Sequence, residues 1–245
     1  MDKGVPTTSD AWRCGGSSVG EMFDRIAPTY DFLNHLLSLG RDRAWRRRAA
    51  RRVAQRGPTS VVDLATGTGD LLIALLRECP DMREAVGLDV SEAMLGIGRE
   101  KVARQGFADR VRFVRDDAVR SALPAGGFDA ATMGFGIRNT PDARATLGEI
   151  HRLLRPGGLA AILEFSLPAC PVMRGCYLVY LRWVVPVIGA VVSGDKGAYR
   201  YLNTSIEAFH RPGDFCSLME EAGFCEVSAS PLTWGVASIY MGTKA

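Results

Sequence analysis

The hydrophobic positions of the chain change their spacing near residue 60, and this change separates two kinds of structure. Between residues 19 and 55, apolar residues recur at the three- and four-residue intervals typical of a helix, as at Ile26, Tyr30 and Leu33. Pro28 is expected to begin a helix in this region. From residue 60 onward, short apolar runs alternate with amphipathic segments. The runs predict strands at 60–65, 84–89, 111–115, 128–134 and 158–165, and the segments between them predict helices near 69–78, 91–104 and 142–154.

This alternation predicts a mostly parallel sheet with helices on both faces, because parallel strands are joined by right-handed crossovers. It stops at residue 168, where prolines and glycines interrupt apolar helical pieces as far as residue 211. A last helix at 213–222 is followed by the runs FCEVSAS and SIYMGTKA, which predict a terminal pair of strands, at least one antiparallel. We expect a flexible tail at 1–18 and one α/β domain at 19–245, with an N-terminal helical cap at 19–56 and an inserted lid at 168–211.

Composition limits the possible functions. A length of 245 residues suits one α/β domain with an elaboration. The six cysteines form no C-x-x-C pair and the three histidines lack ligand spacing, so free thiols and no metal are expected. The most apolar segment, 177–192, is broken by Arg182 and Pro186 and is too short to span a bilayer. The N-terminus lacks the apolar core of a signal peptide, and a cytoplasmic protein is therefore expected.

Basic residues crowd into one segment, although the formal net charge is only +3. Such a cluster can bind nucleic acid or an anionic membrane, or simply form a solvated helix face, and it specifies no partner by itself. Its members are Arg41, Arg43, Arg46, Arg47, Arg48, Arg51, Arg52 and Arg56.

The stretch VVDLATGTGD ends the first predicted strand in a glycine-rich turn. A dinucleotide fingerprint would need a third glycine where Leu72 stands, and a phosphate loop would need a Gly-Lys-Ser/Thr sequence that is missing here. The acidic residues Asp63 and Asp70 flank the turn and disfavour a phosphate. The turn therefore favours a ligand that carries hydroxyls or a positive charge.

Two further strands also end in acidic residues. Asp89 ends the second strand, where a carboxylate can accept hydrogen bonds from a ribose diol. Asp117 and Ala118 follow the third strand, where an acid and a backbone N–H can bind an adenine edge. Together with the turn, these residues describe an adenosine without phosphates whose methionine part lies near Asp63. We predict S-adenosylmethionine as the cofactor, bound by Asp63, Gly67, Thr68, Gly69, Asp89, Asp117 and Ala118.

Four segments resemble the C-methyltransferases of ubiquinone and menaquinone biosynthesis, and the similarity extends from about residue 23 to 244. They are FDRIAPTYDFLNHLLSLGRDRAWRR, FGIRN, RLLRPGGLAAILEFS and YRYLNTSI. The resemblance implies a class I S-adenosylmethionine-dependent methyltransferase with a Rossmann-like fold. It also implies cofactor contacts at Thr68, Asp89, Asp117, Ala118 and Gly134. The sequence departs from the family pattern at Asp42, where relatives have His, and at Gly134, where some have Ser.

The resemblance further implies methylation of a ring carbon in a reduced prenylated quinone. Arg138 follows the fourth strand and is the first candidate for stabilising a phenolate, because a guanidinium lowers the pKa of a nearby phenol. A structural salt bridge is the alternative for Arg138. Tyr30 could hydrogen-bond a quinol oxygen, close over the cofactor or belong to the core. Asp42 replaces an imidazole that could act as the base and would be a weaker base unless buried, and His210 is a possible substitute.

Several functions remain open at this level. Conversion of demethylmenaquinol to menaquinol is the favoured function. The alternatives are methylation in ubiquinone synthesis, methylation of another phenolic natural product, and cofactor binding without catalysis. An RNA methyltransferase lacks supporting segments, so no nucleic-acid partner is expected. The apolar lid could shelter a prenyl tail while nearby arginines meet anionic headgroups at the inner face of the membrane, or the lid residues could simply form a core. A homodimer is also compatible with the sequence.

Overall fold

The computed structural model describes residues 13–14, 17–187 and 196–245. Most of the predicted tail and part of the predicted lid lie outside these residues. Within them, no helix combines the length and the hydrophobicity needed to cross a membrane. The five cysteines whose side chains are described are free thiols, as the sequence predicts.

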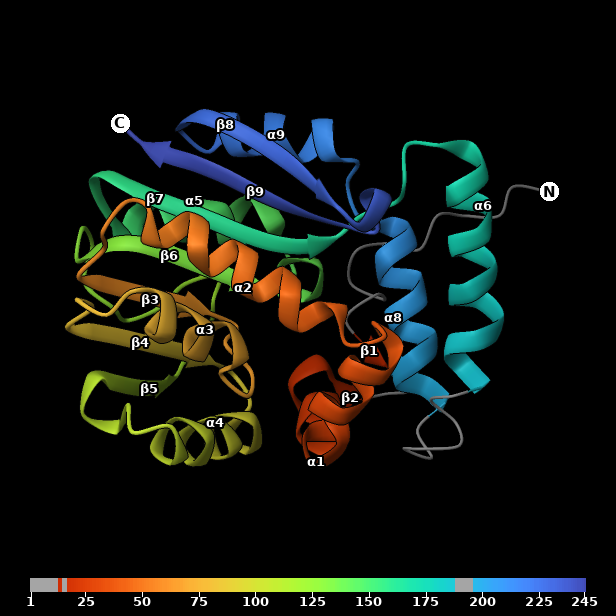
Figure 1. The fold of residues 1–245 in the computed structure, drawn as a ribbon, viewed down its shortest axis with the longest axis horizontal. Coiled ribbons are helices and arrows are strands. Elements are labelled where there is room, and N and C mark those ends of the chain that lie inside the picture. Colours follow the sequence, from red (N-terminus) through yellow and green to blue (C-terminus); the bar gives the residue numbers. More distant parts are fainter. Residues whose placement is uncertain (1–12, 15–16, 188–195) are drawn as a thin grey trace.

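A seven-stranded sheet forms the centre of the molecule, with the strand order β5-β4-β3-β6-β7-β9-β8 (Figure 1). The strands are β3 (Ser60–Leu64), β4 (Glu84–Asp89), β5 (Val111–Arg115), β6 (Phe128–Gly134), β7 (Leu154–Phe165), β8 (Phe224–Leu232) and β9 (Ala237–Lys244). β9 runs antiparallel to β7 and to β8, whereas the pairs from β5 to β7 are parallel. The predicted mostly parallel sheet is thereby confirmed. β7 begins earlier than predicted because Leu154 already pairs with Phe128 across an irregularity in the register.

Helices flank the sheet and continue beyond one of its ends. They are α1 (Val19–Leu37), α2 (Arg41–Ala54), α3 (Asp70–Glu78), α4 (Glu92–Arg104), α5 (Ala143–Leu153), α6 (Pro171–Val179), α8 (Lys196–Ala208) and α9 (Pro212–Glu221). Shorter elements are β1 (Arg13–Cys14), β2 (Ser17–Ser18), η1 (Ala108–Arg110), η2 (Ile137–Asn139), the π-helix η3 (Tyr180–Val184) and η4 (Thr233–Gly235). The prediction for Pro28 is wrong, because Pro28 lies inside α1. Packing of α1 against the rest of the domain outweighs the missing backbone donor.

Two apolar clusters hold the helices against opposite faces of the sheet. α2 and α3 pack on one face, together with Val61 of β3, and α5 and α9 pack on the other, together with Val62 and Leu64. Adjacent strand residues point to opposite faces, which explains this division. A third cluster joins Met22 of α1 to Tyr177, Leu181, Val185 and Ile206 of the lid region. The N-terminal cap and the lid therefore pack on each other at the end of the sheet where β7 terminates (Figure 1).

Candidate functional site

Two neighbouring cavities lie where the parallel strands end. The first has a volume of about 480 Å³ and is lined by α1 and by residues that follow β3, β4, β5 and β6. The second has a volume of about 370 Å³ and is lined mainly by α2, η2, α6, η3, α8 and η4. Tyr30 and Phe135 belong to the walls of both cavities. The two cavities are therefore adjacent, and ligands bound in them would lie close together.

The first cavity collects most of the residues predicted from the strand ends. Gly67, Asp89, Asp117, Ala118 and Gly134 all line it. The carboxylate of Asp89 accepts hydrogen bonds from the backbone N–H of Gly67 at 2.8 Å and from that of Ser91 at 2.9 Å. Burial raises the pKa of Asp89, and the backbone N–H bonds oppose this rise. Asp89 thus fixes the glycine turn and the start of α4 relative to the cavity.

Three of the predicted cofactor residues lie behind the wall of the first cavity and do not line it. Asp63 is buried beneath the turn and accepts hydrogen bonds from Thr66 Oγ1 at 2.7 Å and from Thr132 Oγ1 at 2.6 Å. Thr68 donates its hydroxyl to Asp31 of α1 at 2.6 Å. Gly69 has a φ of 78°, a conformation that glycine adopts at low cost, and precedes the first residue of α3. The structure brings none of these three side chains or backbones to the wall of the first cavity.

Strained backbone marks the boundary between the two cavities. Ala65 and Phe135 have positive φ values of 48° and 59°, which are uncommon for residues other than glycine. A Cβ atom at Gly136 would lie 2.8 Å from Cβ of Ala65, so only glycine permits this approach of the two strand ends. The backbone is thus held in a strained conformation that places Phe135 at the boundary of the two cavities.

Helix α1 forms a roof over the first cavity. Asp24 and Asp31 lie seven positions apart and so share one face of the helix. Asp24 accepts a hydrogen bond from the hydroxyl of Ser91, and Asp31 accepts one from Lys101 Nζ at 2.8 Å besides that from Thr68. These contacts tie the roof to α4 and to the glycine turn.

The second cavity contains a buried ion pair. Arg138 Nη1 donates to Glu164 Oε1 and to the carbonyl oxygen of Phe135, both at 2.7 Å. The side chain of Arg138 is 6% exposed and that of Glu164 is 0% exposed. Nε of Arg138 is buried and has no hydrogen-bond partner among the described residues. Arg138 therefore forms the structural salt bridge considered above and still keeps an unused donor on a side chain that lines the cavity.

Similarity to known proteins identifies the family. A sequence model described as the ubiE/COQ5 methyltransferase family matches residues 12–244. The chain belongs to this family. It is 45% identical over 223 residues to a demethylmenaquinone methyltransferase from Thermus thermophilus, an alignment that covers 91% of this chain and 100% of the relative. It is 42% identical over 229 residues to the ubiquinone/menaquinone biosynthesis C-methyltransferase UbiE from Geobacter sulfurreducens, covering 94% and 89% of the two chains.

A solved structure supports the fold assignment independently. A SAM-dependent methyltransferase from Thermotoga maritima aligns with a TM-score of 0.62 at 18% identity, over 92% of this chain and 99% of that one. The fold of this ubiE/COQ5 family member is thus the predicted class I, Rossmann-like methyltransferase fold.

Tyr30 and Asp42 differ in how well they suit the catalytic roles predicted for them. Tyr30 is half-buried and lines both cavities. Burial raises its pKa, while the charges of Arg138 and Arg46 act to lower it. Asp42 lines the second cavity but accepts hydrogen bonds from Ser38 Oγ and His35 Nδ1, both at 2.7 Å, and from Arg46. Burial acts to raise the pKa of Asp42, but these partners hold it below its usual range, so Asp42 is a poor proton acceptor at neutral pH.

A possible metal cluster at Asp42 and the possible substitute base His210 are both explained by their surroundings. Ligand atoms of His35, Asp42 and Asp70 lie within 4.8 Å of one another. The guanidinium of Arg46 bonds to Asp42 and lies 3.9 Å from Asp70, so this cluster already contains its own cation. His210, the possible substitute base, is exposed between α8 and α9 and packs against Phe209 and Phe215 rather than lining either cavity.

Three wall residues were not among the predicted site residues. Phe135 and Asn139 flank Arg138 in the family-like segment FGIRN, and that segment was the available signal for both. Arg46 is the buried member of the basic cluster. Its spacing of four residues from Asp42 was a usable signal, because such pairs meet on one side of a helix.

The buried carboxyl of Asp63 beneath the glycine turn makes the stability of the protein depend on pH. Burial raises its pKa from 3.8 to about 6, although hydrogen bonds from Thr132 and Thr66 lower it. Between these pH values the folded protein keeps a proton that the unfolded chain has released. The free energy of unfolding therefore falls as the pH rises through this window, by about 3 kcal/mol in total.

The substitution Asp63→Asn removes this cost because the amide does not ionise. We expect the stability of the variant relative to the natural chain to be higher at pH 8 than at pH 4.5 by about 2 kcal/mol. Urea unfolding of both proteins at the two pH values measures this difference. A difference between the proteins that stays constant with pH would contradict the assignment.

Proposed function

We propose that this protein transfers the methyl group of S-adenosylmethionine to a ring carbon of demethylmenaquinol, which yields menaquinol. The observation that carries the proposal is the pair of cavities that share Tyr30 and Phe135, with Arg138 in the wall of the second. The name of the relative from Thermus thermophilus supports this choice of substrate.

The first cavity has the chemistry that S-adenosylmethionine requires. Asp89 offers carboxylate lone pairs to a ribose diol, and Asp117 and Ala118 lie where an adenine edge would bind. Oδ1 of Asn139 is buried without a hydrogen-bond partner in the described part of the chain, and it can accept from an amino group. Gly134 lets β6 approach α3 closely behind this wall, because a Cβ there would lie 3.1 Å from the Leu71 side chain. When bound, the cofactor supplies a methyl group on a positively charged sulfur, which a carbon nucleophile can accept without a metal.

The second cavity would hold the quinol ring and favour its reactive form. The guanidinium of Arg138 stabilises the phenolate of the quinol by lowering its pKa, and the phenolate makes the conjugated ring carbon nucleophilic. Tyr30 lines both cavities and would orient the ring so that its reactive carbon faces the methyl group directly. Met173 and Leu181, with other apolar side chains, exclude water. The carbon–carbon bond would form as the methyl–sulfur bond breaks, which leaves S-adenosylhomocysteine. The ring carbon would then lose its hydrogen as a proton to solvent when the ring regains its aromaticity.

A benzoquinol is the second candidate substrate, because the relative from Geobacter sulfurreducens carries both quinones in its name. The test uses purified protein with labelled S-adenosylmethionine and two reduced substrates, a demethylmenaquinol analogue and a demethoxyubiquinol-type analogue. Label on the naphthoquinol supports the proposal. Label on the benzoquinol alone would replace it with ubiquinone synthesis, and cofactor binding without transfer to either ring would overturn both.

Loosening the roof should weaken cofactor binding. We expect Asp31→Asn to raise the Kd for S-adenosylmethionine about tenfold, because it weakens the bonds to Thr68 and Lys101 that hold α1 over the first cavity. Calorimetric titration measures the change. Glu100→Gln on the exposed side of α4 is the matched control. An unchanged Kd for Asp31→Asn would show that these bonds do not hold the roof.

A further inference from the structure

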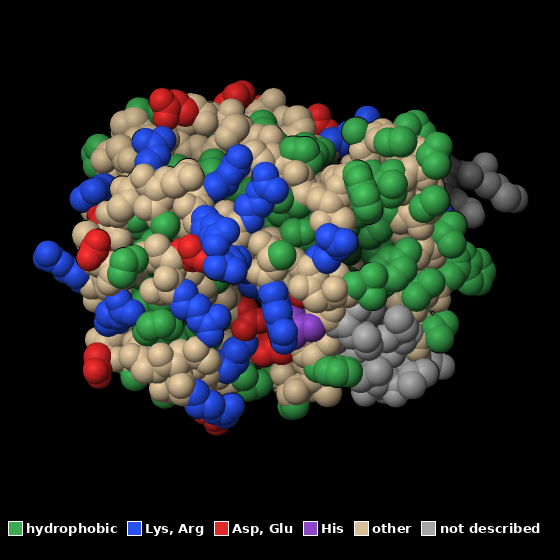
Figure 2. Space-filling view, in the orientation of Figure 1, with side chains coloured by type: hydrophobic (Ala, Val, Ile, Leu, Met, Phe, Trp, Pro, Cys, Tyr) green, Lys and Arg blue, Asp and Glu red, His purple; other side chains and the backbone are tan. Residues whose placement is uncertain are grey.

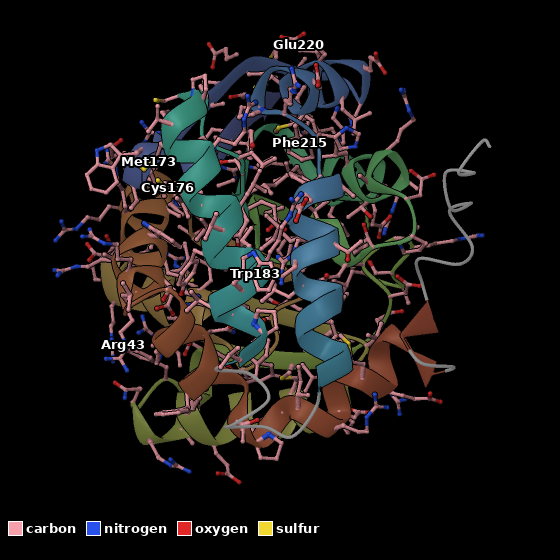
Figure 3. All side chains as sticks on the ribbon, turned by 90° about the vertical axis from the view of Figure 1, so that its right-hand side faces the viewer. Arg43, Met173, Cys176, Trp183, Phe215 and Glu220 are labelled. Carbon is pink, nitrogen blue, oxygen red and sulfur yellow. The ribbon has the colours of Figure 1, made fainter. Side chains whose placement is uncertain are left out.

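The segment formed by α6 and η3 is apolar on both sides. Its inner side is buried and lines the second cavity through Tyr177 and Leu181. Its outer side exposes Val172, Val179 and Trp183, the last of which is 73% exposed. Figure 3 shows Met173, Cys176 and Trp183 along this segment, with α8 beside it. A helix with one packed side in a water-soluble domain normally has a polar outer side, so this outer surface is suited to an apolar environment.

Two turns at the mouth of the second cavity display large apolar side chains. Leu39 and Trp234 line this cavity, yet they are 80% and 74% exposed. Both have positive φ values, 53° and 56°, in the left-handed region that such residues rarely adopt. The backbone is therefore strained at both Leu39 and Trp234, where it exposes an apolar side chain to solvent. Strain of this kind clusters at binding sites and is difficult to explain as ordinary packing.

Positive charge borders this apolar region. Arg41 and Arg48 of α2 are exposed and lie seven positions apart, on one side of the helix. Figure 2 shows a column of Lys and Arg side chains running beside the apolar region, both facing the viewer. Arg182, on the outer side of η3, forms an ion pair with Glu207 and adds no free charge. The surface thus combines exposed tryptophan and aliphatic groups with a basic border.

We propose that this surface docks on a bilayer that contains anionic lipid headgroups. The docking face consists of Leu39, Arg41, Arg48, Val172, Val179, Trp183 and Trp234. Tryptophan and aliphatic side chains enter the interfacial region of a bilayer, and arginines bind the negative headgroups. The mouth of the second cavity lies within this face, so the apolar tail of a prenylated quinol can pass between bilayer and cavity. This last point rests on the proposed function, whereas the docking itself does not.

The test measures binding of the full chain to vesicles without substrate. Binding is measured by flotation with vesicles of phosphatidylcholine alone and of phosphatidylcholine with phosphatidylglycerol. We expect binding to the anionic vesicles together with a blue shift of tryptophan fluorescence, because Trp183 and Trp234 are exposed whereas Trp45 is buried. Arg48→Glu should weaken binding about thirtyfold, as expected for about 1 kcal/mol per charge removed or added. Arg104→Glu on α4 is the matched charge reversal away from the docking face.

A second variant tests the apolar part. Val179→Ser with Trp183→Ser should weaken binding at least tenfold through loss of inserted apolar area. Neither residue, nor Arg48, lines either cavity, so methylation of a short-tailed soluble quinol should be retained by both variants. If the natural chain itself does not methylate the short-tailed quinol, the proposed function is contradicted, whereas the docking result is unaffected.

Three results would overturn the docking proposal. One is that the natural chain fails to float with anionic vesicles. Another is that Arg48→Glu and Arg104→Glu weaken binding equally. The third is that sedimentation shows a dimer that the Val179→Ser and Trp183→Ser changes dissociate, which would assign this face to a second copy of the chain.

Discussion

Replacing Arg138 and Glu164 together by glutamine is expected to lower kcat by about 10²- to 10³-fold while the protein stays folded. In the proposed mechanism the guanidinium of Arg138 favours the phenolate, and removal of one preorganised electrostatic group from an active site typically costs this much. Changing both partners avoids leaving Glu164 buried without its cation, which alone would cost about 3 to 5 kcal/mol of stability.

The pH dependence separates this role from a structural one. In the proposed mechanism Arg138 lowers the pKa of the substrate phenol, so without it a smaller fraction of the phenol is ionised at neutral pH. The activity left in the double variant should rise with pH over a range displaced upward from that of the natural enzyme. Steady-state kinetics from pH 6 to 10 measures kcat and its pH profile. A small loss of kcat with an unchanged pH profile would mean that Arg138 serves only its salt bridge with Glu164.

Replacing Asp89 by asparagine is expected to raise the Kd for S-adenosylmethionine about a hundredfold. The change removes charge-assisted acceptance from the ribose diol, which is worth about 1.5 to 3 kcal/mol per hydrogen bond, and it loosens the Gly67 turn. Calorimetric titration of the variant and of the surface control Asp109→Asn measures the effect.

The demethylated cofactor sharpens this prediction. S-adenosylhomocysteine has the same ribose but an uncharged sulfur, so its Kd should rise by a similar factor in Asp89→Asn. A rise for S-adenosylmethionine alone would mean that Asp89 acts on the positive charge rather than on the ribose.

Local sequence patterns were sufficient to predict the sheet and most of the first cavity. Strand periodicity and the acids at strand ends depend on neighbouring residues, and β3 to β6 place Asp89, Asp117 and Gly134 together as soon as the strands pair in parallel. The second cavity was less predictable, because α2, η2, α6 and η4 contribute its walls from distant parts of the chain.

The remaining differences between the sequence predictions and the structure arise from contacts between residues that are distant in the chain or arranged only by the fold. Thr68 bonds to Asp31, 37 positions away, and no local pattern shows that this hydroxyl is occupied. Asp42 looked like a weakened base, but its acidity depends on Ser38, His35 and Arg46 arranged around it. Pro28 was expected to begin a helix because propensity disfavours it inside one, and tertiary packing of α1 reversed that preference. These features arise from contacts that form only in the folded chain.

The most direct test of the central claim is the position of the transferred methyl group. Purified protein is supplied with S-adenosylmethionine carrying a ¹³C-labelled methyl group and with reduced demethylmenaquinone, and the product is examined by nuclear magnetic resonance. We predict a methyl group bonded to the ring carbon of the naphthoquinol. A methoxy group on the ring oxygen, or no labelled quinol from protein that binds the cofactor, would contradict the account.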